Sequence, residues 1–193
     1  NFFRQLPQDG LLVGCYDHAN TLAVVRSFPN QLQTYGFSPQ AVWQIEKSRI
    51  SQGGIIFNLV HQGVVVEDVT IKVPGQFNVL NATAAFAVLN FLGLNSEMIK
   101  KGLLEFGGTK RRFEFIGQKN GIRFYDDYAH HPQQIKATLK AAKAWFPGQR
   151  IIVVFQPHTY SRTKTFLNEF ARSFSLANFV LVADIYASAR QKK

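Results

Sequence analysis

The stretch Phe124-Tyr125-Asp126-Asp127-Tyr128-Ala129-His130-His131-Pro132 places two carboxylates, a phenol and two imidazoles directly after an apolar segment. Residues 121–125 alternate as a strand does, and Pro132 suits the first position of a helix that we expect to run to about Phe146. The polar residues therefore lie between the end of a strand and the start of a helix. Ligands bind at such junctions in open α/β sheets, and the free N–H groups of the helix start favour an anion.

A second unit of the same kind follows along the chain. Residues 150–155 form a continuous apolar run typical of a buried strand, and we expect a helix from about Lys164 to Phe174. The loop between them reads Gln156-Pro157-His158-Thr159-Tyr160-Ser161-Arg162-Thr163. If the two strands are parallel and joined by a right-handed crossover, both loops lie side by side. The pattern then predicts that three His, two Asp, two Tyr and Arg162 converge on one crevice.

Four motifs in this chain resemble those of the Mur ligase family. DDYAHHP (126–132) is followed about two dozen residues later by VVFQPHTYSRT (153–163), and PGQFNVLNATAA (74–85) and RRFE (111–114) precede them in the family's order and spacing. The resemblance is strongest to the members that join L-alanine to UDP-N-acetylmuramate. It implies an α/β fold in two domains. Residues 1–107 would be the C-terminal half of the central, ATPase-type domain, and residues 108–193 a truncated, Rossmann-like C-terminal domain with a mainly parallel sheet.

Composition and length indicate a globular protein. The chain has 193 residues, of which 46% are hydrophobic, enough for one large core or two modest ones. No run approaches the roughly 20 apolar residues of a membrane span, and no signal peptide is evident, so we expect a cytoplasmic protein that does not bind membranes. The single Cys15 fits a reducing compartment, and we expect it to be a small buried apolar side chain.

The net charge of +10 comes from 22 Lys and Arg that are scattered through the chain. A nucleic-acid-binding surface would need them gathered in a stripe, so we expect no nucleic-acid partner. ATP and a nucleotide sugar carry several negative charges each, and a basic protein suits them.

The first domain is expected to contain short strands at residues 11–15 and 21–25, with His18 in a surface turn between them. Residues 54–73 alternate and turn at His61-Gln62-Gly63, which predicts an antiparallel hairpin. Helices are expected at 79–92, ended by Gly93, and at 96–106. Gly107-Gly108 then predicts a joint, and we set the domain boundary near residue 107.

We expect this chain to be a fragment, because it starts without Met and stops just after an apparent strand at 179–184. The resemblance implies that the domain for the UDP-sugar, the Gly-Lys-Ser/Thr phosphate loop and most Mg²⁺ ligands lie in the missing parts of its own parent chain. The fragment alone is then expected to be inactive, although its parent is an enzyme.

Asn78 and Asn81 are the first candidates for ATP binding. Residues three apart share one face of a helix, and two carboxamides there can donate and accept along the edge of an adenine. The resemblance implies that role for this pair. Asn78 alone could instead be an ordinary N-cap.

The resemblance assigns two further residues to ATP. Arg112 would approach the phosphates, where a planar guanidinium fork is favourable, and Arg111 is the weaker candidate. Asp127 would accept from the ribose hydroxyls, and Asp126 would orient neighbouring groups. The simpler hypothesis for residues 111–114 is a charged strand start.

The remaining candidates concern the acyl-transfer site. The resemblance implies that three residues line the pocket where an acyl phosphate meets the incoming amine: Tyr128, His130 and His131. In the second loop, His158 would bind substrate. Thr159 stands where many family members have Arg, so Arg162, helped by the Thr159 hydroxyl or by the helix N-terminus, is our candidate for the carboxylate of L-alanine.

Three other hypotheses stay open. The chain could belong to the related ligase that attaches a tripeptide to the same sugar nucleotide. It could be a non-catalytic, basic module that binds nucleotides or nucleic acid, although its 18 Phe fall mostly at positions typical of a core. His130, His131 and His158 could also bind a metal, although no Cys supports them.

Overall fold

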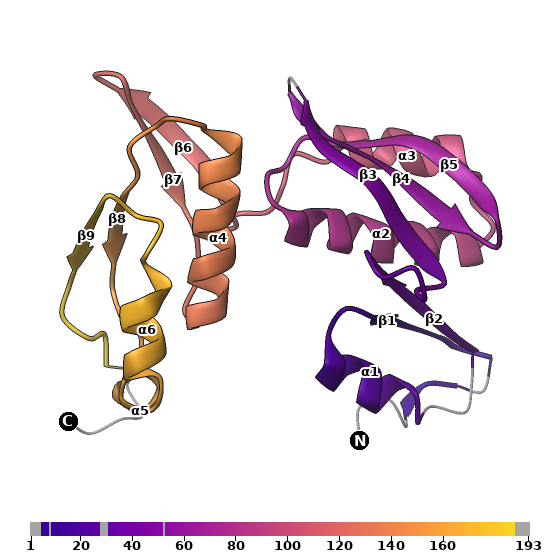
Figure 1. Cartoon of the computed structure of the whole chain (residues 1–193), viewed down its shortest axis with the longest axis horizontal. Helices are drawn as coiled ribbons and strands as arrows, with labels where there is room; N and C mark the ends of the chain where they lie inside the picture. The colour runs from indigo at the N-terminus through magenta and orange to yellow at the C-terminus, as the bar shows by residue number, and fades with distance from the viewer. Residues whose placement is uncertain (1–4, 8, 28–30, 52, 188–193) are drawn as a thin grey trace. The chain divides into compact units, whose positions relative to one another are not determined.

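The computed structural model describes residues 5–7, 9–27, 31–51 and 53–187. The chain divides into two compact units, Asn1–Gly107 and Gly108–Lys193, which we call unit 1 and unit 2 (Figure 1). Both combine helices with strands, which confirms the α/β class. No helix within the described ranges is long and apolar enough to cross a membrane.

Unit 1 is built on a five-stranded sheet in the order β1-β2-β3-β4-β5. Its strands are β1 (Leu11–Cys15), β2 (Gln31–Gly36), β3 (Trp43–Ser51), β4 (Gly54–His61) and β5 (Val64–Ile71). The first three run parallel, and β3, β4 and β5 form an antiparallel meander. The predicted turn joins β4 to β5, with Gln62 and Gly63 at φ 51° and 78°, as a two-residue hairpin requires.

The expected strand at residues 21–25 is wrong, because these residues belong to helix α1 (Ala19–Val25). β1 and β2 are parallel, and parallel neighbours need a crossover that carries the chain back, which α1 supplies. A five-residue apolar run does not by itself distinguish helix from strand. Helix and strand approach closely at Gly14, where a Cβ would stand 3.0 Å from Cγ1 of Val25.

Two smaller predictions concern the same region. His18 is exposed and precedes α1 without capping it, in agreement with a surface position. Cys15 is half-buried rather than fully buried, and this burial raises the pKa of its thiol.

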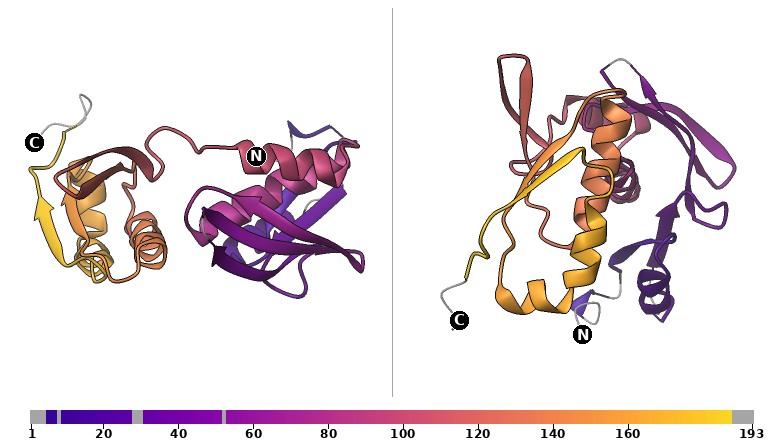
Figure 2. Two further views of the ribbon diagram at one scale, coloured as in Figure 1. Left: turned by 90° about the horizontal axis from the view of Figure 1, so that it is seen from above. Right: turned by 60° about the vertical axis from the view of Figure 1, so that its left-hand side comes forward.

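Helices α2 (Gln76–Phe91) and α3 (Ser96–Glu105) complete unit 1, close to the predicted bounds. Gly93 follows α2 at φ 87°, a conformation that favours glycine, and the Asn95 side chain caps α3 by accepting from the N–H of Met98. The two helices pack along the strands (Figure 2). Trp43 and Phe86, both buried, join sheet to helix with ring centroids 5.4 Å apart.

Unit 2 begins with a hairpin of β6 (Glu114–Lys119) and β7 (Ile122–Asp126). Helix α4 (Pro132–Trp145) follows, beginning at the predicted proline. The remaining elements are β8 (Ile152–Phe155), α5 (Tyr160–Thr165), α6 (Leu167–Ser173) and β9 (Phe179–Val182). The helix expected from Lys164 to Phe174 therefore starts earlier and is divided at Phe166, whose φ of −110° and ψ of 25° interrupt it.

The strands of unit 2 do not form the mainly parallel sheet that we expected. Within the described residues, β6 and β7 make one antiparallel pair, and β8 and β9 make a separate parallel pair. The tight turn at Asn120-Gly121 fixes the partner of β7 locally, whereas β8 pairs with the strand that follows it. β7 and β8 are thus not hydrogen-bonded neighbours.

The core of unit 2 lies between α4, α6 and β8. Ile135, Leu139 and Phe170 are buried together, and Phe155 and Phe166 pack against them. Phe166 thus ends α5 and enters the core at the same point, which accounts for the division of the predicted helix.

We expect Gly54→Ala to destabilise unit 1 by about 1–3 kcal/mol, because a Cβ at residue 54 would lie 2.5 Å from the carbonyl oxygen of Ile71. Gly102→Ala is the matched control. Residue 102 lies in α3 with nothing within 4 Å of its Cβ position, so this change should stabilise by about 0.5–1 kcal/mol.

The measurement is urea unfolding followed by fluorescence in a Trp145→Phe background. Trp43 is then the only tryptophan and reports on unit 1. Equal free energies of unfolding for the two alanine variants would contradict the close packing of β4 on β5.

Candidate functional site

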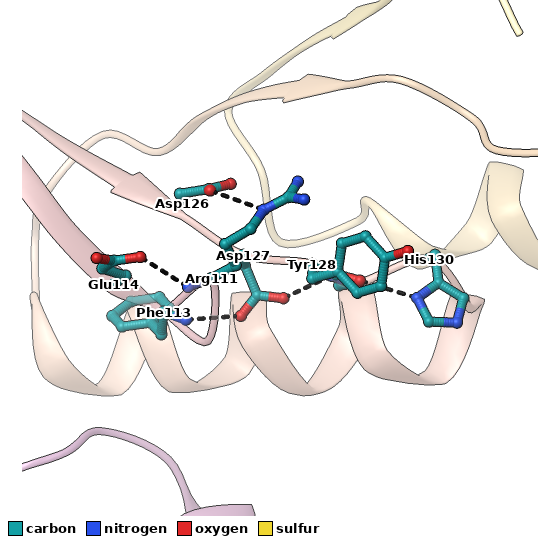
Figure 3. Close-up of polar contacts among 8 residues, drawn as sticks. Arg111, Phe113, Glu114, Asp126, Asp127, Tyr128 and His130 are labelled. Atoms are coloured by element: carbon teal, nitrogen blue, oxygen red, sulfur yellow. Dashed lines mark hydrogen bonds and ion pairs between the residues drawn. The ribbon is translucent and has the colours of Figure 1, made fainter. Parts of the chain in front are cut away.

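Asp127 joins the segment before β6 to the loop after β7. One carboxylate oxygen accepts from the N–H of Phe113, with N···O 2.9 Å, and the other accepts from the N–H of Ala129 at 2.7 Å (Figure 3). Phe113 is buried and lies at φ 50°, so this contact fixes an unfavourable backbone conformation. Each oxygen keeps a second lone pair, and Asp127 can still accept from a ligand hydroxyl.

Arg111 is the centre of a second set of contacts in the same place. Its Nε donates to Oδ2 of Asp126 at 3.0 Å, and its backbone N–H donates to Oε2 of Glu114 at 2.7 Å. The guanidinium carbon lies 4.7 Å from the centroid of the Tyr128 ring, and the N–H of Tyr128 donates to the carbonyl of Arg111 at 2.7 Å. The residue that the sequence ranked below Arg112 is thus the better connected of the two.

Arg112 is exposed, and its side chain makes no ion pair within the part of the chain that the structure describes. The hypothesis of a charged strand start is wrong for residues 111–113, because Arg111 and Phe113 have φ of 58° and 50° and β6 begins at Glu114. The turn leaves the Arg112 guanidinium available to an anion.

The histidines of the first loop are tied to main-chain groups. His130 Nδ1 lies 2.9 Å from the carbonyl oxygen of Tyr128, and the two rings meet edge to face at 5.1 Å. His131 is the N-cap of α4, where its Nδ1 accepts from the N–H of Gln133 at 3.4 Å. The Gln134 side chain accepts from the backbone N–H of both histidines, which completes a capping box.

The second loop, residues 156–159, is held by the segment after β9. His158 stacks on Tyr186 with ring centroids 5.4 Å apart. The N–H of Thr159 donates to the carbonyl of Tyr186 at 3.0 Å, and the N–H of Tyr186 donates to the carbonyl of Pro157 at 2.8 Å. Thr159 has φ 71° and ψ 132°, which is strained for a β-branched residue. Arg162 lies on the short helix α5 that follows.

The structure does not bring the two loops into direct contact within the described ranges, and the first loop instead contacts a residue beyond the second one. The His131 ring meets the edge of Phe166, at the end of α5, with centroids 4.7 Å apart. His158, Thr159 and Arg162 make no hydrogen bond or ring contact with residues 126–131 within the described ranges. No group of three or more His, Cys, Asp or Glu in those ranges is arranged to hold a metal ion.

The two asparagines of unit 1 lie on the same face of α2, as their spacing predicts. Asn81 Nδ2 donates to Oδ1 of Asn78 at 3.4 Å, and Asn78 Nδ2 donates to the carbonyl of Pro74 at 2.8 Å. The N-cap is Gly75, so the capping hypothesis for Asn78 is wrong. Asn78 is held by the start of the helix, whereas Asn81 is exposed and its carbonyl oxygen accepts no hydrogen bond from the described residues.

Sequence reasoning missed three residues that shape these loops: Arg111 as an organising residue, Gln134 and Tyr186. The spacing of His131 and Gln134 is that of a capping box, which would have found Gln134. The other two act through main-chain contacts and stacking, and no short sequence pattern encodes those.

Comparison with known proteins gives two domain matches. Residues 1–89 match the Mur ligase middle domain, and residues 111–192 match the domain described as "Mur ligase, glutamate ligase domain".

Whole-chain relatives are similar in the same way. The chain is 44% identical over 195 residues to the UDP-N-acetylmuramate–L-alanine ligase of Caldanaerobacter subterraneus subsp. tengcongensis, an alignment that covers 98% of this chain and 42% of that protein. The chain spans about two-fifths of the length of the curated relatives it matches.

Two solved structures share the fold. The crystal structure of the UDP-N-acetylmuramate-alanine ligase of Thermotoga maritima superposes with a TM-score of 0.71 at 32% identity, covering 80% of this chain and 34% of that one. A murein peptide ligase of Psychrobacter arcticus has a TM-score of 0.63 at 25% identity, covering 93% and 38%.

We expect Asp127→Asn to destabilise unit 2 by about 1–3 kcal/mol, because an amide offers one acceptor oxygen where two backbone N–H groups need one each. Asp126→Asn is the control. It weakens only a half-exposed ion pair with Arg111 and should cost less than about 1 kcal/mol.

The free energy of unfolding of unit 2 can be read from the NMR amide signals of β6 and β7 during urea titration. Equal losses in the two variants would show that Asp127 does not hold the loop.

Proposed function

The chain belongs to the Mur ligase family, and from this premise we propose that it works within an ATP-dependent ligase that joins L-alanine to the carboxylate of UDP-N-acetylmuramate. The observation that carries the proposal is the similarity, over nearly the whole chain, to a ligase of that name. The reaction belongs to peptidoglycan precursor synthesis, and we assign the protein to the cytoplasm. Its substrates are then ATP, UDP-N-acetylmuramate and L-alanine.

In unit 1 we assign Asn78 and Asn81 to the adenine. Asn78 is immobilised by Pro74, and Asn81 presents a carboxamide on the exposed side of α2. In unit 2 we assign Arg112 to the phosphates and Asp127 to the ribose. The Arg112 guanidinium makes no ion pair among the described residues and can bind a phosphate, and Asp127 keeps acceptor capacity beyond its two backbone contacts.

The reaction activates the carboxylate as an acyl phosphate, which the amine of L-alanine then attacks to give an amide and phosphate. Catalysis of this kind depends on positioning and on neutralising phosphate charge. Mg²⁺ supplies part of that neutralisation when bound, and we assign none of its ligands to this chain. We place Tyr128, His130 and His131 around the reacting groups, because the α4 cap holds both histidines at one helix start.

The carboxylate of L-alanine is assigned to the second loop. Arg162 supplies the cationic group from helix α5, directly after this loop, and Thr159 and His158 precede it on a backbone fixed by Tyr186. A planar guanidinium can bind a carboxylate through two parallel N–H groups.

A ligase that attaches a peptide to the same sugar nucleotide is the second candidate function. The murein peptide ligase shares the fold, although it is less similar in sequence than the L-alanine ligases. A free amino acid needs a site for its carboxylate close to its amine, and Arg162 provides one. A peptide carries that carboxylate elsewhere and would not depend on Arg162 in the same way.

We expect a hybrid, in which this chain replaces the matched segment of the Caldanaerobacter relative, to release phosphate from ATP only when UDP-N-acetylmuramate and L-alanine are both present. The unaltered relative is the control for expression and assay. Phosphate release with a tripeptide but not with L-alanine would establish the second candidate. A folded hybrid that binds ATP and ligates neither would favour a non-catalytic binding module.

In the same hybrid, Arg162→Ala should raise the KM for L-alanine at least about tenfold, since a charge-assisted hydrogen bond contributes roughly 1.5–3 kcal/mol. The KM for ATP should change little. Lys164→Ala, on the same helix, is the control and should change neither constant. If Arg162→Ala raises the KM for ATP and leaves that for L-alanine unchanged, this loop serves the phosphates.

A further inference from the structure

The two histidines of the first loop contact main-chain groups of opposite kind. A carbonyl oxygen only accepts, so the nitrogen of His130 that faces the Tyr128 carbonyl, Nδ1, must carry a hydrogen. A backbone N–H only donates, so the nitrogen of His131 that faces the N–H of Gln133, also Nδ1, must carry none. In the neutral rings, Nε2 is therefore an acceptor in His130 and an N–H donor in His131.

The orientation of His130 depends on Tyr128, whose carbonyl and ring both contact the imidazole. Tyr128 is 45% exposed, so core packing does not fix its ring. Arg111 fixes the position of the ring instead. Its guanidinium carbon lies 4.7 Å from the centroid of the Tyr128 ring, and its carbonyl accepts from the N–H of the same residue.

Arg111 is itself held at several points. Asp126 fixes the guanidinium through Nε, and Glu114 fixes the backbone N–H. A chain of contacts therefore runs from β6 and β7 through Arg111 and Tyr128 to one imidazole. Neither Arg111 nor Asp126 is needed to hold α4, which His131 and Gln134 cap separately.

We propose that Arg111 is a positioning residue that, through Tyr128, holds His130 with Nε2 as a proton acceptor, beside His131 with Nε2–H as a hydrogen-bond donor. The two adjacent histidines then have different roles. The catalytic consequence rests on the proposed function, whereas the tautomers and their dependence on Arg111 do not.

In the ligation step, the amine nitrogen forms the bond to the acyl carbon. The bond between that carbon and the phosphate oxygen breaks, and its electron pair leaves with the phosphate. The nitrogen must lose a proton, which passes to Nε2 of His130. The Nε2–H of His131 donates to an oxygen of the reacting acyl phosphate, where negative charge develops.

The test is NMR of the imidazole nitrogens in the 193-residue chain under mildly alkaline conditions, which favour neutral imidazole rings. Long-range ¹H–¹⁵N correlations distinguish the two tautomers. We expect the Nδ1–H form for His130 and the Nε2–H form for His131. Wild-type rings with the same tautomer would overturn the proposal.

Arg111→Gly removes the side chain and suits the φ of 58° at that position, so the backbone turn is retained. We expect His130 to exchange between both tautomers in this variant and His131 to keep its own. Arg123→Ala is the matched control. It deletes another arginine of unit 2, stacked 4.1 Å over Phe146, and should leave both histidines unchanged.

Tyr128→Ala is the second variant, should Arg111→Gly fail to fold. It deletes the ring between Arg111 and His130, keeps the carbonyl, and should also release the His130 tautomer. Unchanged His130 signals in either folded variant would contradict the positioning role.

Kinetics in the hybrid separate the two levels of the proposal. We expect Arg111→Gly to lower kcat about tenfold or more, since general base catalysis contributes roughly 10²–10⁴-fold, with the KM for ATP nearly unchanged. If His130 exchanges between both tautomers in the Arg111→Gly chain but no form of the hybrid ligates, only the proposed function is refuted. If His130 exchanges between both tautomers but Arg111→Gly leaves kcat unchanged, the role of His130 as base is refuted.

Discussion

The two hydrogen bonds to the carboxylate of Asp127 are the interaction on which the arrangement of the first loop depends. The carboxylate accepts from the N–H of Phe113 and from that of Ala129, so it fixes the approach to β6 and the exit from β7 at once. Buried or half-buried N–H groups that lose their acceptor are costly, and charged acceptors bind them most strongly. One side chain therefore contacts both the turn that carries Arg111 and Arg112 and the loop that carries Tyr128 and both histidines.

Two different constraints act on this loop. The Asp127 contacts set the course of the backbone, whereas Arg111 acts on what the backbone presents, by stacking on Tyr128 and pairing with Asp126. The rings of Phe113, Tyr125 and Phe146 pack together in the same unit, and burial raises the pKa of the Tyr125 hydroxyl although Arg123 opposes the shift. The polar loop is thus supported by an apolar layer on the same unit.

Much of the fold could be predicted from the sequence because its signals are local. The β4–β5 hairpin, the C-terminal glycine of α2 and the start of α4 at Pro132 each depend on a few adjacent residues. The failures involve partners distant in sequence. The segment 21–25 is a helix because β1 and β2 are parallel, and β7 pairs with β6 rather than with β8. Asn120-Gly121 is a sequence typical of a two-residue hairpin turn, and it would have predicted the β6–β7 pair in place of the expected parallel sheet.

The candidate site could likewise be predicted only in part. Its residue types and spacing were visible in the sequence, but the direction of each hydrogen bond was not. Nothing in the letters His130-His131 indicates that one ring faces a carbonyl and the other an N–H. Positive φ at Arg111 and Phe113 was equally hidden, since these residue types seldom adopt it.

Amide hydrogen exchange at Phe113 and Ala129 tests the central role of Asp127 most directly. Ala129 lies outside every helix and strand, so its protection must come from the carboxylate. We predict that both amides are protected about tenfold or more over unstructured loop residues, and that they open with the same free energy. Protection of Phe113 with exchange of Ala129 at the unprotected rate would contradict this account, because the carboxylate would then hold only one of the two segments.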